Sequence, residues 1–149
     1  MSTLADPIVR AACRARIQRL DAYASPKWGR MTVRQMVCHL NDSFRVGMGE
    51  KYASPATSVL QRTLVKWIAL RTPLRWPPGV PTRPEIEQGR GGTPPAEWES
   101  DRAELVELID GFRERRAFAE HPAFGKLSRS EWLIWGYRHV DHHLRQFGV

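Results

Sequence analysis

The chain has 149 residues, of which 42% are hydrophobic and 26% are charged. This length and composition are typical of one globular domain with a buried core, and they exclude collagen-like, disulfide-scaffold and wholly disordered chains. The 23 basic and 16 acidic residues give a net charge of +7, which favours anionic partners without identifying one, because the basic residues are dispersed. We therefore expect a single domain over residues 1–149.

The sequence shows no sign of membrane insertion or secretion. No apolar run approaches the roughly 20 residues that a membrane-spanning helix needs, and residues 1–7 lack the charged-then-apolar order of a signal peptide. Cys13 and Cys38 belong to no CxxC pair, so we expect them to be reduced core residues. These observations predict a cytoplasmic protein with no membrane partner.

Two helices are predicted in the first third of the chain. The first runs from Pro7 to Tyr23, where apolar residues recur at spacings of three and four. The second follows Thr32, which forms a capping box with Gln35, and it continues to Gly47.

A third helix is predicted over Ala56–Arg71, with Leu60, Leu64, Trp67 and Ile68 on its buried face. The segment Thr72–Pro95 that follows is rich in proline and glycine, which preclude a long regular element. Because loops of this length in compact domains are often functional, we expect the segment to pack over the open end of a bundle as a lid, and packing against another subunit is the alternative.

Two more helices complete the chain. The fourth runs from Pro95 to Ala117, with Leu105, Leu108, Ile109 and Phe112 as a continuous apolar stripe. The last begins after Ser128, which forms a second capping box with Glu131, and it reaches Phe147. Amphipathic helices without strands predict an all-α, up-and-down four-helix bundle with an extra short helix and a long Pro/Gly-rich loop.

Three of the five histidines lie in the last helix. His139 and His143 are four residues apart, so their side chains project from the same face, a common way to present two imidazoles to a divalent metal. His142 is an alternative second ligand on a different edge of the helix. Histidines are also favoured near a helix C-terminus by the helix dipole, which is the structural alternative.

A third ligand is predicted on the second helix. His39 lies at the margin of its apolar face, and a bundle can bring it opposite His139 and His143. Three imidazoles with one open position form a catalytic type of metal site, whereas a lone His39 would be a hydrogen-bonded core residue. Asp42, Asp141 and Gln146 are candidates for orienting a ligand or lining the pocket, and His121, which precedes Pro122, is expected to be structural.

These histidines lie within segments that resemble a known superfamily. The segments are residues 26–32 with 35–40 (PKWGRMT and QMVCHL), 120–125 (EHPAFG) and 139–148 (HVDHHLRQFG). In these segments and in their order the chain resembles the DinB/YfiT-like superfamily of four-helix-bundle metalloenzymes, in an uncharacterised branch. Where much of the superfamily has Arg-Gly-Gln after its second histidine, this chain has Leu144, Arg145 and Gln146.

The resemblance implies a metal site and a class of chemistry. It places zinc or nickel on His39, His139 and His143, and it implies an enzyme similar to thiol S-transferases, with a low-molecular-weight thiol as cosubstrate and a small-molecule substrate. Arg145 and Gln146 are the candidate pocket residues, and homodimers occur among the relatives.

Other functions stay open at the level of the sequence. The same site in a non-catalytic metal-binding bundle or a stress-related protein would only stabilise the fold, and a metal-bound water would give a hydrolase. A nucleic-acid binder is disfavoured, because the basic residues are dispersed and no helix-turn-helix, zinc-finger or RNP motif is present.

Overall fold

The computed structural model describes residues 1–149 and is all-helical, as predicted. Its elements are α1 (Pro7–Gln18), α2 (Val33–Gly47), η1 (Gln61–Val65), α3 (Lys66–Arg71), η2 (Pro84–Ile86), α4 (Trp98–Glu114) and α5 (Arg129–Gln146). The π-helical segment η1 runs directly into α3, and η2 is a single 3-10 turn. The one extended pairing is an isolated bridge between His121 and Gly125.

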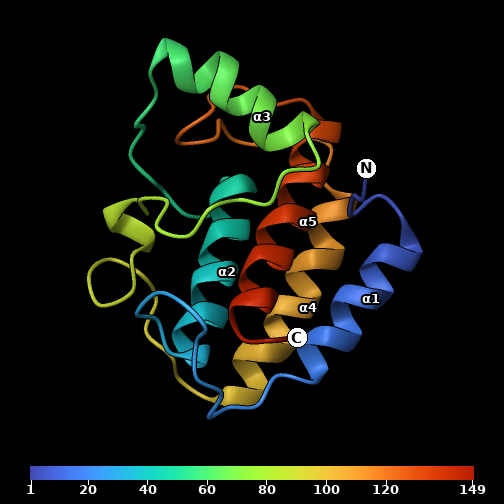
Figure 1. Ribbon diagram of the computed structural model, residues 1–149, viewed down its shortest axis with the longest axis vertical. Helices are drawn as coiled ribbons and strands as arrows, with labels where there is room; N and C mark the ends of the chain where they lie inside the picture. Colours follow the sequence, from blue (N-terminus) through green and yellow to red (C-terminus); the bar gives the residue numbers. More distant parts are fainter.

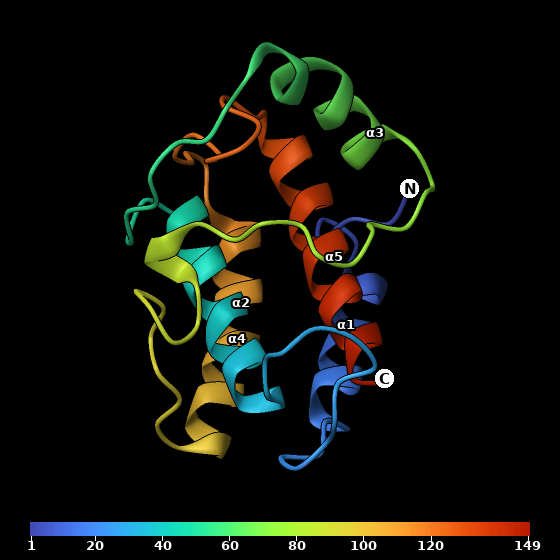
Figure 2. The same ribbon diagram turned by 60° about the vertical axis from the view of Figure 1, so that its left-hand side comes forward.

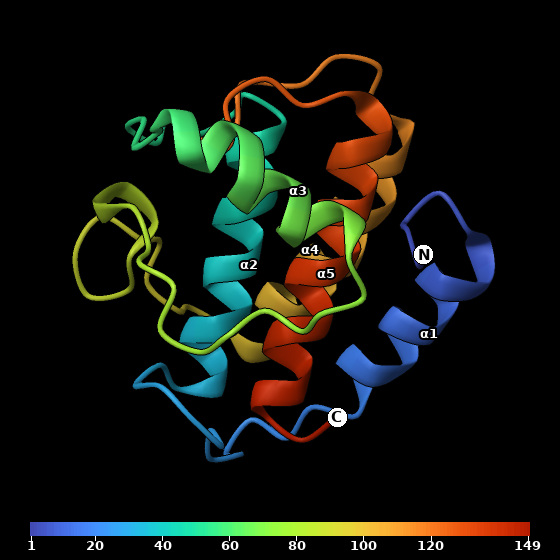
Figure 3. The ribbon, with the colours of Figure 1, turned by 45° about the horizontal axis from the view of Figure 1, so that its top comes forward.

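Helices α1, α2, α4 and α5 lie side by side, and η1 with α3 lies across one end of them (Figures 1 and 3). Helices α2 and α4 run in the same direction. The side-chain amide of Asn41 donates to the carbonyl of Asp101 near the start of α4, and Gly47 lies against Phe112 near its end. The prediction of a simple up-and-down order is therefore wrong for this pair. The physical reason is the long connection over residues 48–97, which returns the chain to the level at which α2 began.

One hydrophobic core of 21 buried residues joins the four long helices. Its centre is aromatic: the Phe44 and Phe112 rings meet edge to face with centroids 4.8 Å apart, and Trp132 and Trp135 do so at 5.0 Å. Such edge contacts add to the stabilisation that the burial of large rings supplies. The predicted stripe on α4 is confirmed at Leu105, Ile109 and Phe112, which are fully buried.

The predicted helix starts of α2 and α5 are confirmed in atomic detail. The Thr32 hydroxyl accepts from the Gln35 amide while the Gln35 side chain accepts from the Thr32 amide, and Ser128 and Glu131 repeat this exchange. Each box gives side-chain acceptors to two backbone amides that would otherwise lack partners at a helix start. The two helices that carry the candidate histidines are therefore fixed at their first turns.

Two predicted helices are shorter than expected. Helix α1 ends at Gln18 instead of Tyr23, because the Asp21 side chain accepts from the Tyr23 amide and forms a local turn. Helix α4 begins at Trp98 instead of Pro95, with the Glu97 side chain capping the amide of Ser100, and it ends at Glu114 instead of Ala117.

The third predicted helix exists over residues 59–71, but its burial is the reverse of the expectation. Leu60, Leu64, Trp67 and Ile68, which the pattern places on a buried face, are all exposed. Only Leu70 enters the core. Because the helix lies across the end of the bundle (Figure 3), it contacts the bundle through the side that carries Arg62, Lys66 and Leu70, and the predicted apolar face is left to solvent.

The Pro/Gly-rich segment 72–95 crosses the face of the bundle formed by α2 and α5 (Figure 2). It is fixed at its far end by Thr93, whose amide and hydroxyl both donate to the buried carboxylate of Asp42 at 2.7 Å. The segment thus packs over a side of the bundle, whereas η1 and α3 lie across its end, so the predicted cover of the open end does not come from this segment (Figures 1 and 2). None of the helices combines the length and apolar composition that crossing a membrane requires.

Candidate metal centre

Three histidines from two helices meet at one point beneath segment 72–95. His39 comes from the middle of α2, and His139 and His143 come from successive turns of α5. The Nε2 atom of His139 lies 3.3 Å from that of His39 and 3.2 Å from that of His143. One nitrogen from each ring lies within 4.8 Å of the others, so the three predicted ligands come together and could hold a metal ion.

Hydrogen bonds to the outer ring nitrogens fix the tautomers of two of the three rings. The Nδ1 atom of His39 lies 3.2 Å from the carbonyl oxygen of Ile86, and that of His143 lies 2.8 Å from Oε1 of Gln146. The Gln146 amide nitrogen in turn donates to the carbonyl of Trp28 at 2.7 Å, which sets the orientation of the amide. Because both outer partners only accept, each Nδ1 carries the proton and each Nε2 presents a lone pair to the cluster.

The environment of the cluster opposes protonation. Burial lowers the pKa of His39, and burial with the neighbouring imidazoles lowers the pKa of His139 and His143 well below the ordinary value. The Nε2 lone pairs of His39 and His143 therefore face Nε2 of His139 at 3.3 Å and 3.2 Å. The neutral His139 ring has one proton, so it can donate a hydrogen bond to at most one of these two nitrogens. A single cation between the rings satisfies all three nitrogens at once. The neutral, converging donor set therefore fits a divalent metal.

Aromatic rings enclose the cluster. The ring centroids of Trp135 and Trp76 lie 4.9 Å and 6.0 Å from that of His139. His142 is not part of the cluster, since its ring packs between Trp28 at 5.7 Å and Trp76 at 6.3 Å. Of the two candidate second ligands on α5, His143 therefore lies in the cluster, and His142 packs against the Trp28 and Trp76 rings.

Of the residues predicted to assist the ligands, one contacts a ring. Gln146 bonds His143, as its register predicted. Asp141 instead pairs with Arg16 and Arg145, and Asp42 accepts from the loop and pairs with Lys51 at 2.9 Å. Neither Asp42 nor Asp141 orients an imidazole, because basic or backbone donors engage both carboxylates. Asp141 does line the cavity that Arg145 borders, in agreement with the pocket role predicted as its alternative.

Arg145, the other predicted pocket residue, lies on the outer side of α5. It lines a cavity of about 490 Å³ together with Arg138, Arg75 and Tyr137. Trp76 also lines this cavity, so one indole borders both the cavity and the histidine cluster.

Two features of the site were not found by sequence reasoning. They are the Ile86 carbonyl that fixes His39 and the Trp76 ring that covers His139. Ile86 is an apolar residue between two glutamates inside a Pro/Gly-rich segment, and it is buried. An isolated apolar residue in such a segment could have indicated that the segment packs against the helices at this position.

Comparison with known proteins places the chain in a family. Residues 8–148 match the family described as protein of unknown function DUF1569, and the chain belongs to this family. No curated protein and no solved structure matches it. The family carries no assigned activity, and the resemblance to the DinB/YfiT-like superfamily stays a prediction.

Proposed function

We propose that His39, His139 and His143 hold one divalent metal ion, zinc or nickel, and that the protein is a metal-dependent enzyme similar in activity to thiol S-transferases. The observation that carries the metal assignment is the convergence of three Nε2 atoms, two of which are fixed as lone-pair donors by bonds at Nδ1. Outer hydrogen bonds of this kind orient metal-binding histidines and raise their basicity.

The donor set favours a catalytic site over a structural one. Structural zinc sites are closed by four protein ligands, whereas catalytic sites have three and keep one position for water or substrate. The cluster contains three histidines and no cysteine or carboxylate. Cys38 adjoins His39 in sequence but is buried elsewhere, and burial raises the pKa of its thiol to about 12.

The residues around the cluster would control what reaches it. A metal ion at this position would lower the pKa of a thiol or water bound beside it and so supply a nucleophile near neutral pH. Gln146 and Ile86 hold two of the rings in place, and Trp76 and Trp135 exclude bulk water from one side of the site. The low local dielectric strengthens every charge interaction within it.

The thiol assignment rests on the resemblance of residues 26–40, 120–125 and 139–148 to the DinB/YfiT-like superfamily. The cavity on the outer side of α5 supports it through Arg75, the guanidinium of its lining that no protein group engages, because low-molecular-weight thiols carry carboxylates that arginine binds in a bidentate manner. Arg145 pairs there with Asp141, and Arg138 donates to the carbonyls of Thr72 and Leu74. We propose a small-molecule thiol as the cosubstrate.

Metal content tests the site directly. Tag-free protein is loaded with zinc or nickel, desalted and measured by elemental mass spectrometry, for the wild type and for His39→Ala, His143→Ala and His142→Ala. We expect about one metal per chain in the wild type and at least tenfold less in His39→Ala and His143→Ala.

His142→Ala is the matched control, because it removes a neighbouring buried histidine of the same helix that lies outside the cluster. It should keep its metal. Full loading of His143→Ala with an unchanged far-UV circular dichroism spectrum would contradict the assigned site. If the metal-loaded protein transfers no low-molecular-weight thiol to an electrophile, the transferase assignment is wrong and the assignment as a metal-binding protein stands.

A further inference from the structure

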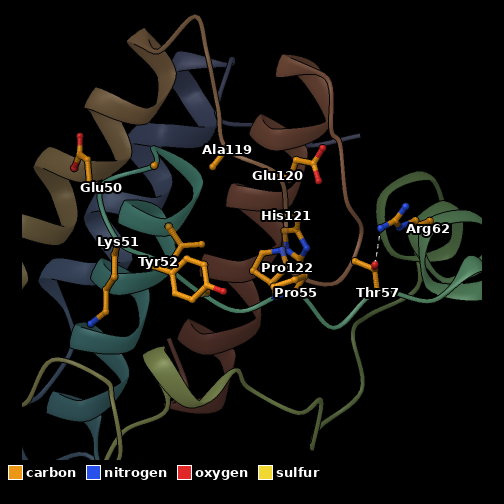
Figure 4. A pocket seen from close by; sticks show the side chains of 13 residues that line it. Glu50, Lys51, Tyr52, Pro55, Thr57, Arg62, Ala119, Glu120, His121 and Pro122 are labelled. Atoms are coloured by element: carbon orange, nitrogen blue, oxygen red, sulfur yellow. Dashed lines mark hydrogen bonds between the residues drawn. The ribbon is translucent and has the colours of Figure 1, made fainter.

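A second cavity lies beside the histidine cluster and holds His121, a histidine that the proposed function does not use. It has a volume of about 430 Å³, within the range of small-molecule sites. Its walls come from the end of α2, the segment that follows it, η1 and the loop between α4 and α5 (Figure 4). The Tyr52, Pro55 and Pro122 rings form an apolar side, and His121 lies among them (Figure 4).

The backbone around His121 determines which of its nitrogens carries the proton. Its Nδ1 lies 3.1 Å from the amide nitrogens of both Ala123 and Phe124, which can only donate. Nδ1 is therefore unprotonated, and the proton is on Nε2. The ring is held flat on Phe124, with centroids 4.5 Å apart and planes 13° apart. The predicted structural role of His121 is correct for Nδ1, which closes the turn.

The other nitrogen of His121 has no such role. Nε2 makes no hydrogen bond within the protein, and it is not fully buried. Because His121 lines the cavity, we take this nitrogen to face it. Burial lowers the pKa of His121 to about 3, so the ring stays neutral over the physiological range. His121 thus presents a fixed N–H donor to the cavity.

Arg62 supplies a charge to the same cavity. Its Nη2 donates to the Thr57 hydroxyl at 2.8 Å, and its side chain lies against Gly125, the bridge partner of His121. No carboxylate pairs with Arg62.

The other charged groups of the wall are engaged or turned away. Lys51 pairs with Asp42, and Glu50 pairs with Arg115. The Glu120 side chain points away from the Tyr52 and His121 rings (Figure 4). The free side-chain donors of the cavity are therefore a guanidinium, a neutral imidazole N–H and the Tyr52 hydroxyl, a combination suited to an anionic oxygen acceptor.

We propose that this cavity binds a small carboxylic acid, with Arg62 pairing with the carboxylate, the Nε2–H of His121 donating to it, and Tyr52, Pro55 and Pro122 packing on its apolar part. The site is distinct from the metal centre. The Trp135 ring lies between them, with its centroid 5.3 Å from that of His121 and 4.9 Å from that of His139. The proposal does not depend on metal binding.

Nuclear magnetic resonance of metal-free, ¹⁵N-labelled protein tests it, with benzoate as the probe. Long-range proton–nitrogen correlation should show the His121 ring protonated at Nε2 alone. Benzoate should shift the His121 ring signals and the amides of residues 52–57 and 121–125 in a saturable manner. Benzamide, which has the same shape without the charge, should bind at least tenfold more weakly.

Matched variants separate the two donors. Arg62→Gln should weaken benzoate binding at least tenfold, whereas Arg116→Gln, the same charge change at an exposed residue outside the cavity, should leave it unchanged. His121→Asn keeps an acceptor oxygen near the position of Nδ1 but has no atom at Nε2, and it should weaken binding several-fold. If His121→Asn fails to fold, the comparison of Arg62→Gln with Arg116→Gln and the tautomer of His121 in the wild type still test the proposal.

The proposal is overturned by a proton on Nδ1 of His121, by shifts that do not saturate or that spread over the surface, or by equal losses in Arg62→Gln and Arg116→Gln. Loss of metal in the cluster variants with unchanged benzoate binding would separate this site from the metal centre. Failure of the metal assignment leaves this test unaffected.

Discussion

His143 and His121 present opposite chemistry with the same side chain. Gln146 accepts from Nδ1 of His143, which leaves a lone pair on Nε2, whereas two backbone amides donate to Nδ1 of His121, which leaves a proton on Nε2. The first ring is prepared for a cation and the second for an oxygen acceptor. The partner at the outer nitrogen therefore determines what a buried histidine can bind.

The comparison extends to how each partner is held. Gln146 is three residues from His143 on the same helix, so α5 alone sets that tautomer. His39 obtains its partner from Ile86, 47 residues away in the Pro/Gly-rich segment. The His121 turn is local, and it closes on Gly125 through paired backbone hydrogen bonds of 2.9 Å and 2.8 Å. Changes at these partners should therefore affect the three rings differently.

The largest effect is expected on the stability of the fold at low pH, where His121 opposes protonation. Its pKa is about 3 in the folded chain and 6.5 when unperturbed, so the unfolded chain binds more protons between these values. Stability is fully present above about pH 6.5 and is lost as the pH falls toward 3. His121→Asn removes this titration. At pH 7 the variant should be less stable than the wild type, because it loses the ring stacked on Phe124. Between pH 7 and pH 4.5 this difference should change by about 2–3 kcal/mol in favour of the variant.

Urea unfolding of metal-free protein at both pH values measures this difference. Because every other group titrates in both chains, the change in the difference between wild type and variant isolates His121. A constant difference across the pH range would contradict the buried neutral ring.

The next effect is expected at the partner of His143. Gln146→Leu removes the acceptor of its Nδ1 and the donor to the Trp28 carbonyl, and it should weaken metal binding by about 10–100-fold. Gln146→Glu keeps an acceptor oxygen and should bind metal more tightly than Gln146→Leu does. Competition with a chromogenic chelator measures both affinities. Equal affinities for the two variants would show that the hydrogen bond to His143 has no effect.

The smallest effect is expected at the anchor of the segment that carries the partner of His39. Thr93→Val removes the hydroxyl bond from Thr93 to Asp42 and the bond from Lys51 to the same hydroxyl, but it keeps the backbone bond to Asp42 and the Lys51–Asp42 pair. The loss of stability should be about 1 kcal/mol, with less than a tenfold change in metal affinity. Thr63→Val, which removes an exposed bond from the Thr63 hydroxyl to the Val59 carbonyl, is the control and should change stability by less than about 0.5 kcal/mol. Equal losses in both variants would show that the anchor is not specific.

Much of the fold follows from local signals in the sequence. Both capping boxes, the apolar stripe of α4 and the irregular character of residues 72–95 were predicted because each depends on residues near one another in the chain. The pairing of His139 with His143 is of the same kind, since the helical repeat alone brings side chains four apart together.

The errors have a common origin. The apolar face of residues 59–71 has helical periodicity, but periodicity does not say whether another element covers that face, and here Leu60, Leu64 and Trp67 remain exposed. The direction of α4 relative to α2 was also missed, because a connection of this length permits either direction.

The sequence by itself determined the helices, their first turns and the side-by-side imidazoles of α5, because hydrogen bonds and side-chain spacing within one helix need no distant partner. Only the tertiary structure decided that His39 faces them, that Ile86 fixes its tautomer and that Arg62 lies beside the turn of His121. These contacts join residues far apart in the chain, and they depend on how the core packs α2 against α5 and on where the long connection crosses them.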